Sequence, residues 1–503
     1  MTLAVETSGS LSRPLATSPV IIAVGLVACA AIVASIPPLI AVGFDYEKFY
    51  SEGYNAYHAT RAAAGEVLYT GDPERLLNYP FLSFYLVGWL KPLFGDILLI
   101  GRVLSIFALA ATVVGSAVVV RRLGGQTLDG VFAAACVLGY QIVQAPAWIG
   151  SNDPQFLAEA LMIGGLACYL GDRASTSRLA VTALLFALGG FTKHNLVAIP
   201  IAVTLDILFN NRRAFALWSG FALAALAFLT GLAYLVAGGD FFNEVLAPRA
   251  WGLTQMKYHL QKFAIAFKLP IVLTLVYLAR PLTCDKAVLL RSYGVVSLAT
   301  AIIFAGGEGT SFNTFLDVVV FLGIVAGLAL QRWRLAFPAT DRLRRYSVLL
   351  LLPLIIAQPI VQRIPATTAR LLALHESLKA DAEEEEKFGI AKAALRSHPG
   401  AALCESLLMC LEAGKPLLVD TFNTRQMILT GRMRETVLLD EIARHRFAVI
   451  QLPSGIYLSG QPGIIAPNFS TPPRLTETTL HTIDKYYRPA AEAGGRAFYV
   501  PKP

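Results

Sequence analysis

The chain has 503 residues, of which 55% are hydrophobic and only 15% are charged, and its mean hydropathy is +0.58. A soluble protein carries roughly 25% charged residues, so the composition excludes an ordinary soluble enzyme and places most of the chain in lipid. The net charge of +8 is not a nucleic-acid signature. The basic residues fall in short clusters between apolar runs, which is typical of a multi-pass membrane protein.

Apolar runs recur through most of the chain, and a helix needs about 20 such residues to cross a bilayer. The runs cover residues 20–43, 97–120, 130–149, 155–171, 178–192, 195–210, 214–237, 262–279, 288–305, 313–330 and 346–361. We therefore predict a polytopic α-helical membrane protein with about eleven transmembrane helices. Residues 1–19 are expected to form a cytoplasmic tail, and residues 20–361 the transmembrane domain.

The segments between these runs alternate in charge. Lysine and arginine concentrate in one set: "RRLGG" (121–125), "GDRASTSR" (171–178), "NNRR" (210–213), 279–291 and "QRWRLAFPATDRLRR" (331–345). The other set is neutral or acidic: "FDYE" (44–47), "GSNDP" (150–154), "GGDFFNE" (238–244) and "GGEGTSFN" (306–313). Because cytoplasmic loops are rich in lysine and arginine, we expect a cytoplasmic N-terminus, and everything after the last span outside. The expected location is a bacterial inner membrane.

The first outer loop is predicted to run from residue 44 to 96. Its second part, "YPFLSFYLVGWLKPLFGD" (79–96), is apolar but short, and Lys91 and Pro92 interrupt it. Counting it as a span would place Arg121 and Arg122 outside. We therefore predict a helix that lies along the outer interface or dips into it. A loop of this length usually has a function.

The composition changes at about residue 362, where charged residues become frequent. Alternating segments at 415–420 ("KPLLVD") and 446–453 ("RFAVIQLP") predict strands, and "RETVLLDEIARH" (434–445) predicts a helix. Residues 362–503 are therefore expected to form a small extracytoplasmic α/β domain. Its acidic run "DAEEEE" (381–386) is typical of a solvated helix face rather than a metal site.

Six cysteines are too few for a disulfide scaffold. Cys404 and Cys410, however, would both meet an oxidising space in the C-terminal domain, where a disulfide between them could form.

Carboxylates cluster at the outer end of the first span. Asp45 and Glu47 form an Asp-x-Glu pair, and Tyr46 and Tyr50 are among the aromatic residues around it that suit sugar stacking. Asp153 stands in the next outer loop and could converge on the same cleft. The alternative for Asp45 is a solvated carboxylate that only marks the end of a span.

Cationic residues also occur where the positive-inside rule does not expect them. Lys193 and His194 lie at an outer turn, in "FTKHNL" (191–196), and would suit the phosphate of a lipid headgroup. The alternative for Lys193 is a lysine that snorkels to the interface. Arg102, near the outer end of the second span, is expected to pair either with Asp96 or with a lipid phosphate.

The third outer loop, residues 244–260, offers Arg249 and Lys257, which could cover an active site or belong to an interfacial helix. Glu308 is a further outer carboxylate. The sequence contains no Walker-type phosphate loop, no His-Glu-x-x-His and no Cys/His set with metal-ligand spacing. No metal site is therefore predicted, although Asp45 and Glu47 together could hold a divalent cation.

In their order, these pieces resemble the polytopic GT-C glycosyltransferases. The closest resemblance is to the bacterial branch with protein mannosyltransferases and lipid A aminoarabinose transferases. It rests on the acidic pair after the first span, on 79–96 followed by "GRVLSIFALAATVVGSAVVVRRLGG" (101–125), on "GSNDPQFLAEALM" (150–162) and on "GGFTKHNLVAIPIA" (189–202). It covers roughly residues 20–330, and the C-terminal domain more loosely.

The resemblance implies transfer of a sugar from a polyprenyl-phosphate donor to a glycan, lipid or protein acceptor at the outer face of the membrane. It assigns Asp45 and Glu47 to a catalytic pair with Asp45 as general base, places Lys193 near the donor phosphate, and gives Asp153 an orienting role. Tyr79 is a further candidate for substrate contact. Attack opposite the leaving group would invert the anomeric centre.

Two other classes of function compete with this reading. A polytopic transporter of a glycan or lipid-linked substrate would explain the many spans, but its site would lie near the middle of the bilayer. A non-catalytic scaffold for envelope assembly would not need the carboxylates at all.

Overall fold

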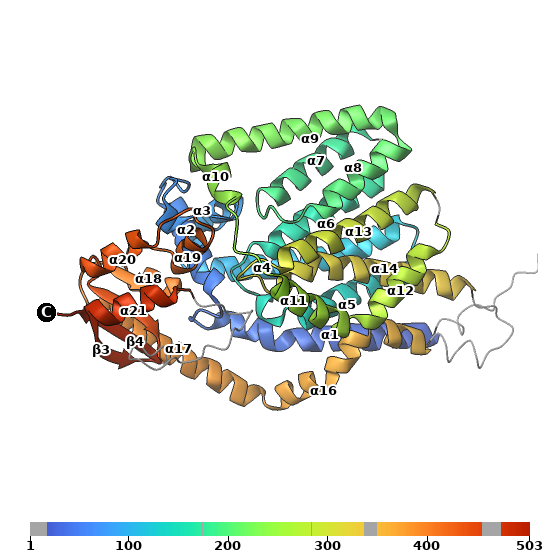
Figure 1. Ribbon diagram of the computed structural model, residues 1–503. Helices are drawn as coiled ribbons and strands as arrows, with labels where there is room; N and C mark the ends of the chain where they lie inside the picture. Colours follow the sequence, from blue (N-terminus) through green and yellow to red (C-terminus); the bar gives the residue numbers. More distant parts are fainter. Residues whose placement is uncertain (1–17, 174, 283, 337–349, 455–473) are drawn as a thin grey trace, which may run out of the picture.

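The computed structural model describes residues 18–173, 175–282, 284–336, 350–454 and 474–503. A bundle of long helices makes up most of the molecule, and a small mixed domain that contains the C-terminus lies at one end of the bundle (Figure 1). Helices α2 and α3 lie at this same end (Figure 1). The predicted cytoplasmic tail, residues 1–19, falls almost wholly outside the described residues.

Six helices in the described part of the chain are long and apolar enough to cross a membrane on their own. They are α1 (Ser18–Ile40), α4 (Ile97–Arg122), α5 (Thr127–Gln144), α9 (Arg212–Leu232), α13 (Cys284–Ala305) and α14 (Leu316–Ala336). Helix α14 lies in the middle of the bundle, because 83% of its apolar segment is buried, whereas α9 lies at the edge with 17% buried.

The other predicted spans also coincide with helices, but of different form. Two are bent pairs: α11 (Leu253–Ala266) meets α12 (Lys268–Ala279) at 82°, and helix Leu350–Ile356 meets α16 (Gln358–Leu372) at 79°. Three are short: α6 (Gln155–Gly171), α7 (Thr176–Gly190) and α8 (Ala198–Asn210). By length and composition, six helices among the described residues qualify as spans, or up to eight with each bent pair counted once.

The difference from the predicted number has a simple physical origin. The longest of the three short helices has 17 residues, or roughly 26 Å at 1.5 Å per residue, less than the hydrocarbon core of about 30 Å. Helix α6 packs against α4 and α7, and α8 packs against α13 and α9, so neighbouring helices cover them.

The first outer loop is folded. It contains α2 (Tyr50–Ala63) and α3 (Leu82–Phe94), which pack against each other. Helix α2 is almost entirely buried, which its weak hydropathy does not suggest. Helix α3 exposes Trp89, Leu93 and Phe94, as expected of the predicted interfacial helix, although its placement in a bilayer stays a prediction.

The C-terminal domain combines helices with a four-stranded sheet. Its elements are α17 (Leu374–Ser397), β1 (Ala402–Cys404), α18 (Leu407–Glu412), α19 (Thr421–Leu429), α20 (Thr436–Ala443), β2 (Val449–Pro453), α21 (Glu477–Tyr486), β3 (Tyr487–Ala493) and β4 (Arg496–Pro501). The strand order is β1-β2-β4-β3. Strand β1 runs parallel to β2 with Ala402 opposite Val449, and β4 runs antiparallel to both of its neighbours.

Several details of this domain were predicted from the sequence. Strand β2 and helix α20 confirm the predicted strand at 446–453 and helix at 434–445, and Cys404 and Cys410 form a disulfide. The predicted strand at 415–420 is wrong. The Asp420 amide donates instead to the Glu74 carbonyl of the first outer loop, at 2.6 Å, so this segment bonds to the loop rather than to a neighbouring strand.

The acidic run of α17 is only partly a solvated face. Glu383 and Glu386 are exposed, but three other members make contacts. Asp381 accepts a hydrogen bond from Tyr46, Glu385 accepts one from the backbone of Asp45, and Glu384 pairs with Arg496.

One hydrophobic core joins the C-terminal domain to the first outer loop. It contains Tyr54 and Tyr57 of α2 together with Leu407 and Leu408 of α18 and Phe498 of β4. Helix α16 runs through the boundary predicted at residue 361, so the division into two domains stays a prediction. The short remaining elements are η1 (Ala41–Gly43), η2 (Pro73–Arg75), η3 (Pro146–Trp148), η4 (Ala233–Ala237), α10 (Phe241–Val245) and η5 (Phe312–Phe315).

Candidate functional site

A cleft of about 540 Å³ lies between the helical bundle and the C-terminal domain. Its walls come from α2 and the segment before α3, the turn between α7 and α8, segments 245–251 and 303–314, and the C-terminal residues Phe422, Asn423 and Arg474. This size is in the usual range for small-molecule sites.

A buried ion pair forms part of the wall. Lys193 Nζ lies 2.8 Å from Asp153 Oδ1, and the two side chains are only 5% and 2% exposed. The ammonium also lies 4.7 Å from the centre of the Tyr79 ring. Burial lowers the pKa of Lys193, but the interactions with Asp153 and Tyr79 together raise it, so the net shift of the pKa is upward and the group stays charged.

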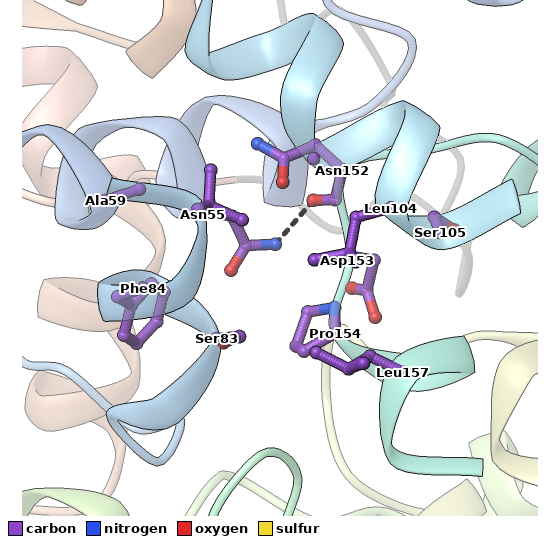
Figure 2. A pocket seen from close by; sticks show the side chains of 12 residues that line it. Asn55, Ala59, Ser83, Phe84, Leu104, Ser105, Asn152, Asp153, Pro154 and Leu157 are labelled. Atoms are coloured by element: carbon purple, nitrogen blue, oxygen red, sulfur yellow. Dashed lines mark hydrogen bonds between the residues drawn. The ribbon is translucent and has the colours of Figure 1, made fainter. Parts of the chain in front are cut away.

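Helix α2 fixes the backbone that carries Asp153. The side chain of Asn55 donates to the Asn152 carbonyl at 2.7 Å, and Glu52 accepts from the Asn152 amide at 3.0 Å. Asp153 Oδ1 also accepts from the amide of Gln155 at 2.9 Å, which caps the start of α6. The carboxylate is therefore held by Lys193 and by the amide of Gln155, while α2 holds the backbone next to it (Figure 2).

Aromatic rings and arginines line the rest of the cleft. The guanidinium of Arg249 lies 5.5 Å from the ring centre of Phe422. When the side-chain amide of Asn78 is oriented with its oxygen toward Arg249, Arg249 Nη2 donates to that oxygen at 2.8 Å. Arg474 lies 4.4 Å from the ring centre of Tyr50. Lys193 pairs with Asp153, the one carboxylate among the described lining residues, and Arg474 pairs with Glu405 at 2.7 Å, so Arg249 is the one lining cation without a carboxylate partner in the described structure.

His194 differs from its expected role as a cation. Burial, together with the nearby Arg249 and Lys193, lowers the pKa of its imidazole to about 4, so the ring is neutral near pH 7. Its Nδ1 is buried and has no hydrogen-bond partner among the described residues. The side chain lines the cleft, where it can act as a neutral hydrogen-bonding group.

Arg102 lies outside the cleft lining, and its expected pairing with Asp96 is wrong within the described structure. It forms a closed ion pair with Glu52 and donates to the carbonyls of Phe44 and Tyr46. Asp96 instead caps the start of α4 through the amides of Leu98 and Leu99. Glu52 was not predicted as the partner of Arg102, because it lies in α2, whose low hydropathy does not suggest a buried helix.

Asp45, Tyr46 and Glu47 also lie outside the cleft lining. Their side chains face the C-terminal domain instead: Asp45 pairs with Lys392 at 3.2 Å and Glu47 accepts from Ser406 at 2.6 Å. Arg102 binds the carbonyls of Phe44 and Tyr46, on either side of Asp45.

The remaining candidates divide in the same way. Tyr50, Tyr79 and Arg249 line the cleft, and Lys257 is exposed on α11 outside it. Glu308 pairs with Arg425 of the C-terminal domain at 2.7 Å, directly beside the lining residues Gly307 and Gly309. In the described part of the chain, no group of three His, Cys, Asp or Glu residues could hold a metal ion.

Sequence reasoning missed several lining residues, notably Trp148, Phe422 and Arg474. Trp148 stacks on Phe49 at 4.6 Å between ring centres. Phe422 and Arg474 come from the C-terminal domain, so only the docking of that domain brings them to the site. A sequence pattern within one element could not have found them.

No family model matches the chain, and no curated protein matches it by sequence. Among solved structures, the chain is similar to ArnT from Cupriavidus metallidurans bound to undecaprenyl phosphate, with a TM-score of 0.60 and 15% identity over 95% of this chain and 98% of ArnT. The apo form of ArnT gives a TM-score of 0.61, 14% identity and the same coverage. An Archaeoglobus fulgidus oligosaccharyltransferase tethered to an acceptor peptide gives a TM-score of 0.49 and 11% identity, over 98% of this chain and 74% of that one. The likeness to ArnT shows that this chain has the same overall fold, a polytopic helical bundle with a small C-terminal α/β domain, as predicted.

Proposed function

We propose that the protein is a glycosyltransferase that moves a sugar from a polyprenyl-phosphate donor to a glycan, lipid or protein acceptor. The reaction takes place at the outer face of a bacterial inner membrane, with the N-terminus in the cytoplasm and the C-terminal domain outside. The observation that carries the proposal is the buried pair of Lys193 and Asp153 in the wall of a cleft lined by aromatic rings and by Arg249, in a chain with the fold of ArnT.

The charges of the cleft suit a lipid phosphate. Lys193, Arg249 and Arg474 line the cleft; Lys193 pairs with Asp153 and Arg474 with Glu405, which leaves Arg249 without a competing carboxylate among the described residues. Negative charge grows on the leaving phosphate as the glycosidic bond breaks, and preorganised cations in a dry site stabilise it. Asp153 holds the Lys193 ammonium in place for this role. That ArnT has been solved with undecaprenyl phosphate supports the same class of ligand here.

The aromatic residues suit the sugar. Tyr50, Tyr54, Tyr79 and Phe422 offer ring faces with polar edges in the same cleft as the cations. Such faces pack against the apolar side of a pyranose or furanose ring. His194, neutral and with an unpartnered Nδ1, is placed to hydrogen-bond a sugar hydroxyl.

The general base is assigned to Asp45, which takes the proton of the acceptor hydroxyl during inverting attack. Its side chain is 45% exposed at the mouth of the first span, and its ion pair is with Lys392 of α17. Because Asp45 lies outside the cleft lining, this role requires the segment that carries it to approach the cleft when the substrates bind. Asp153 is the alternative base, because it lines the cleft directly.

The test is release of polyprenyl phosphate in lipid nanodiscs, with a mixture of polyprenyl-phosphate sugars as donors and a membrane extract as acceptor. Wild-type protein should release polyprenyl phosphate, and Lys193→Met should reduce release at least ~100-fold, the scale of one lost transition-state contact. Lys257→Met, an exposed lysine outside the cleft, is the matched control and should keep activity. If Lys193→Met releases as much polyprenyl phosphate as Lys257→Met, Lys193 does not have the proposed role. Movement of the lipid-linked sugar across the membrane without release of polyprenyl phosphate would favour a transporter.

The same assay assigns the base. Asp45→Asn should abolish release if Asp45 is the base, while the variant still binds undecaprenyl phosphate. If Asp45→Asn keeps activity and Asp153→Asn loses it without losing undecaprenyl phosphate, the base is Asp153 instead.

A further inference from the structure

A separate groove of about 240 Å³ lies between α1, α5 and α16. It shares no described lining residue with the cleft. Helix α16 runs alongside α1 at the lower edge of the bundle (Figure 1), and α1 is apolar enough to cross a membrane. Leu26 and Cys29 of α1 line the groove and are exposed, so the groove opens on the side of the bundle that would face lipid.

The groove is closed and apolar where α16 begins. Ile360 is only 3% exposed there, and a methyl group on Gly139 of α5 would lie 2.3 Å from Ile360 Cδ1. One turn later, Ile364 is 44% exposed. Both isoleucines line the groove together with Leu26 and Ile142. Its closed end is therefore an aliphatic surface, and it opens along α16.

The charged groups of the groove are gathered on α16. Arg363, Thr367 and Arg370 all line it, at spacings of four and three residues that place them on one face of the helix. Thr368 adds a second hydroxyl, and no aspartate or glutamate is among the described lining residues. The groove thus combines an aliphatic surface with two cations and two hydroxyls.

The two arginines have few partners within the chain. In its described part, neither forms an ion pair, and their one hydrogen bond runs from Arg363 Nη2 to the Val143 carbonyl at 3.4 Å. That is long for an N–H donor, and each guanidinium has five such donors. Val143 lies in the last turn of α5, so Arg363 can serve as a cap for this helix end, but Arg370 has no such role. Cations at the lipid-facing surface of a bundle are usually partnered, which points to an anion outside the chain.

We propose that the groove binds a bilayer phospholipid with an anionic headgroup. One acyl chain lies against Leu26, Ile142 and Ile364, and the headgroup phosphate lies at the level of Thr367. Arg363 and Arg370 are separated by roughly 10 Å along the helix axis, so their long side chains reach this phosphate from either side. Guanidinium groups bind phosphate through paired hydrogen bonds. A volume of 240 Å³ is below the usual range for a whole ligand and suits one chain of a lipid.

A polyprenyl phosphate has the same phosphate chemistry, but its proposed place is the cleft, which the groove does not join. The phospholipid has a structural role instead, which does not depend on the proposed function. It ties α16 to α1 and α5. Helix α16 leads directly into α17, whose Lys392 pairs with Asp45, so the lipid stabilises the attachment of the C-terminal domain to the bundle.

The first test compares two lipids with identical acyl chains, anionic phosphatidylglycerol and zwitterionic phosphatidylcholine, by native mass spectrometry of the full chain in detergent. Wild type should bind phosphatidylglycerol at least ~10-fold more tightly, and the double variant Arg363→Gln/Arg370→Gln should bind both lipids equally. If this variant does not fold, Arg370→Gln alone, at an exposed position, carries the test. Equal affinities in wild type, or an unchanged preference in the variant, would overturn the proposal.

The matched control is Lys257→Gln/Lys262→Gln. These exposed lysines lie on α11, which also belongs to a bent helix pair, and they lie outside the groove lining. The control removes the same number of charges and should keep the preference for phosphatidylglycerol. Loss of the preference in the control as well would mean that net charge, not the groove, attracts the lipid.

The second test concerns the aliphatic part. A ligand that binds only the folded protein raises its melting temperature, so phosphatidylglycerol should raise that of wild type. Cys29→Trp, which places a large side chain in the groove, should reduce this rise. Ile22→Trp, at a position of α1 that is exposed but outside the groove lining, should not. Equal rises in both variants would contradict binding in the groove.

Undecaprenyl phosphate serves as the competitor. It should not displace phosphatidylglycerol from the groove, and Arg363→Gln/Arg370→Gln should bind it like wild type. If undecaprenyl phosphate competes and the double variant weakens both ligands, the groove belongs to the donor site and the phospholipid proposal is wrong. None of these measurements requires transferase activity, so a failure of the proposed function would leave their outcome unchanged.

Discussion

Arg102 and Glu52 form an ion pair that is closed to solvent, although they come from different elements, α4 and α2. Arg102 Nη2 lies 2.8 Å from Glu52 Oε2, its Nε lies 2.8 Å from Oε1, and the two side chains are 1% and 0% exposed. Glu52 also accepts from the amides of Lys48 and Asn152. The pair therefore ties the end of the first span, the helix α2 and the segment that carries Asp153 into one unit.

Removing one member of this pair should destabilise the packing of α2 against α4 and the segment that carries Asp153. Arg102→Gln leaves the Glu52 carboxylate buried without a cation, which typically costs about 3–5 kcal/mol. We expect a clear drop in the melting temperature in detergent and lower expression. Arg291→Gln, which changes an exposed arginine on α13, should melt like wild type. A small effect of Arg102→Gln would mean that Glu52 is not buried as a charged group.

The contact between α2 and α18 offers a second prediction. A methyl group on Gly53 would lie 2.3 Å from the Leu408 nitrogen and 2.6 Å from Glu47 Oε1, closer than atoms can approach. Gly53→Ala should therefore cost about 1–3 kcal/mol and make the C-terminal domain easier to cleave by protease.

Gly220→Ala is the control for this substitution. Gly220 lies in α9 with nothing within 4 Å of the added methyl group, and alanine in a helix interior is favoured by roughly 0.5–1 kcal/mol. If both variants keep a wild-type protease pattern and melting temperature, the close packing of α18 on α2 is wrong.

The sequence predicted what depends on local patterns. Apolar runs located the long helices, and alternating residues located β2. The order of short motifs indicated the GT-C fold, and the placement of Lys193 against the positive-inside rule marked a residue that lines the cleft.

What the sequence could not supply was the pairing of distant elements. Arg102 and Glu52 are 50 positions apart, and Glu47 meets Ser406 across 359 positions. No periodicity within one element encodes such contacts. This is why Asp45 and Glu47 were expected in the cleft with Lys193, whereas the structure turns them toward the C-terminal domain.

The disulfide between Cys404 and Cys410 should stabilise this docked arrangement. It links β1 to α18, next to Ser406, which binds Glu47. Closing a loop this short is worth about 2 kcal/mol by the loop-entropy relation. Reductant should lower the melting temperature of wild-type protein. The double variant Cys404→Ala/Cys410→Ala should have a lower melting temperature than wild type without reductant, and reductant should not change it. Cys29→Ala, which removes a free exposed cysteine, should respond like wild type.

Glu47 gives the stability of the protein a defined dependence on pH. Burial, opposed in part by Arg474 and Ser406, raises the pKa of its carboxyl from 4.5 to about 7, and its Oε1 has no hydrogen-bond partner among the described residues. As pH rises from 4.5 to 7, the unfolded chain releases this proton before the folded chain does, so the contribution of Glu47 to stability falls across that window and stays low above it.

Glu47→Gln removes this titration and keeps an acceptor for Ser406. Near pH 5 the variant should therefore have a melting temperature close to that of wild type. Near pH 8 its melting temperature should be higher than that of wild type, because at that pH only the wild-type protein carries a buried charge at position 47. Thermal unfolding at both pH values checks the sign. Glu386→Gln, at an exposed position of α17, should show the same difference from wild type at both. If Glu47→Gln is less stable than wild type at the higher pH, the carboxylate is instead held as an anion by Arg474 in the folded protein.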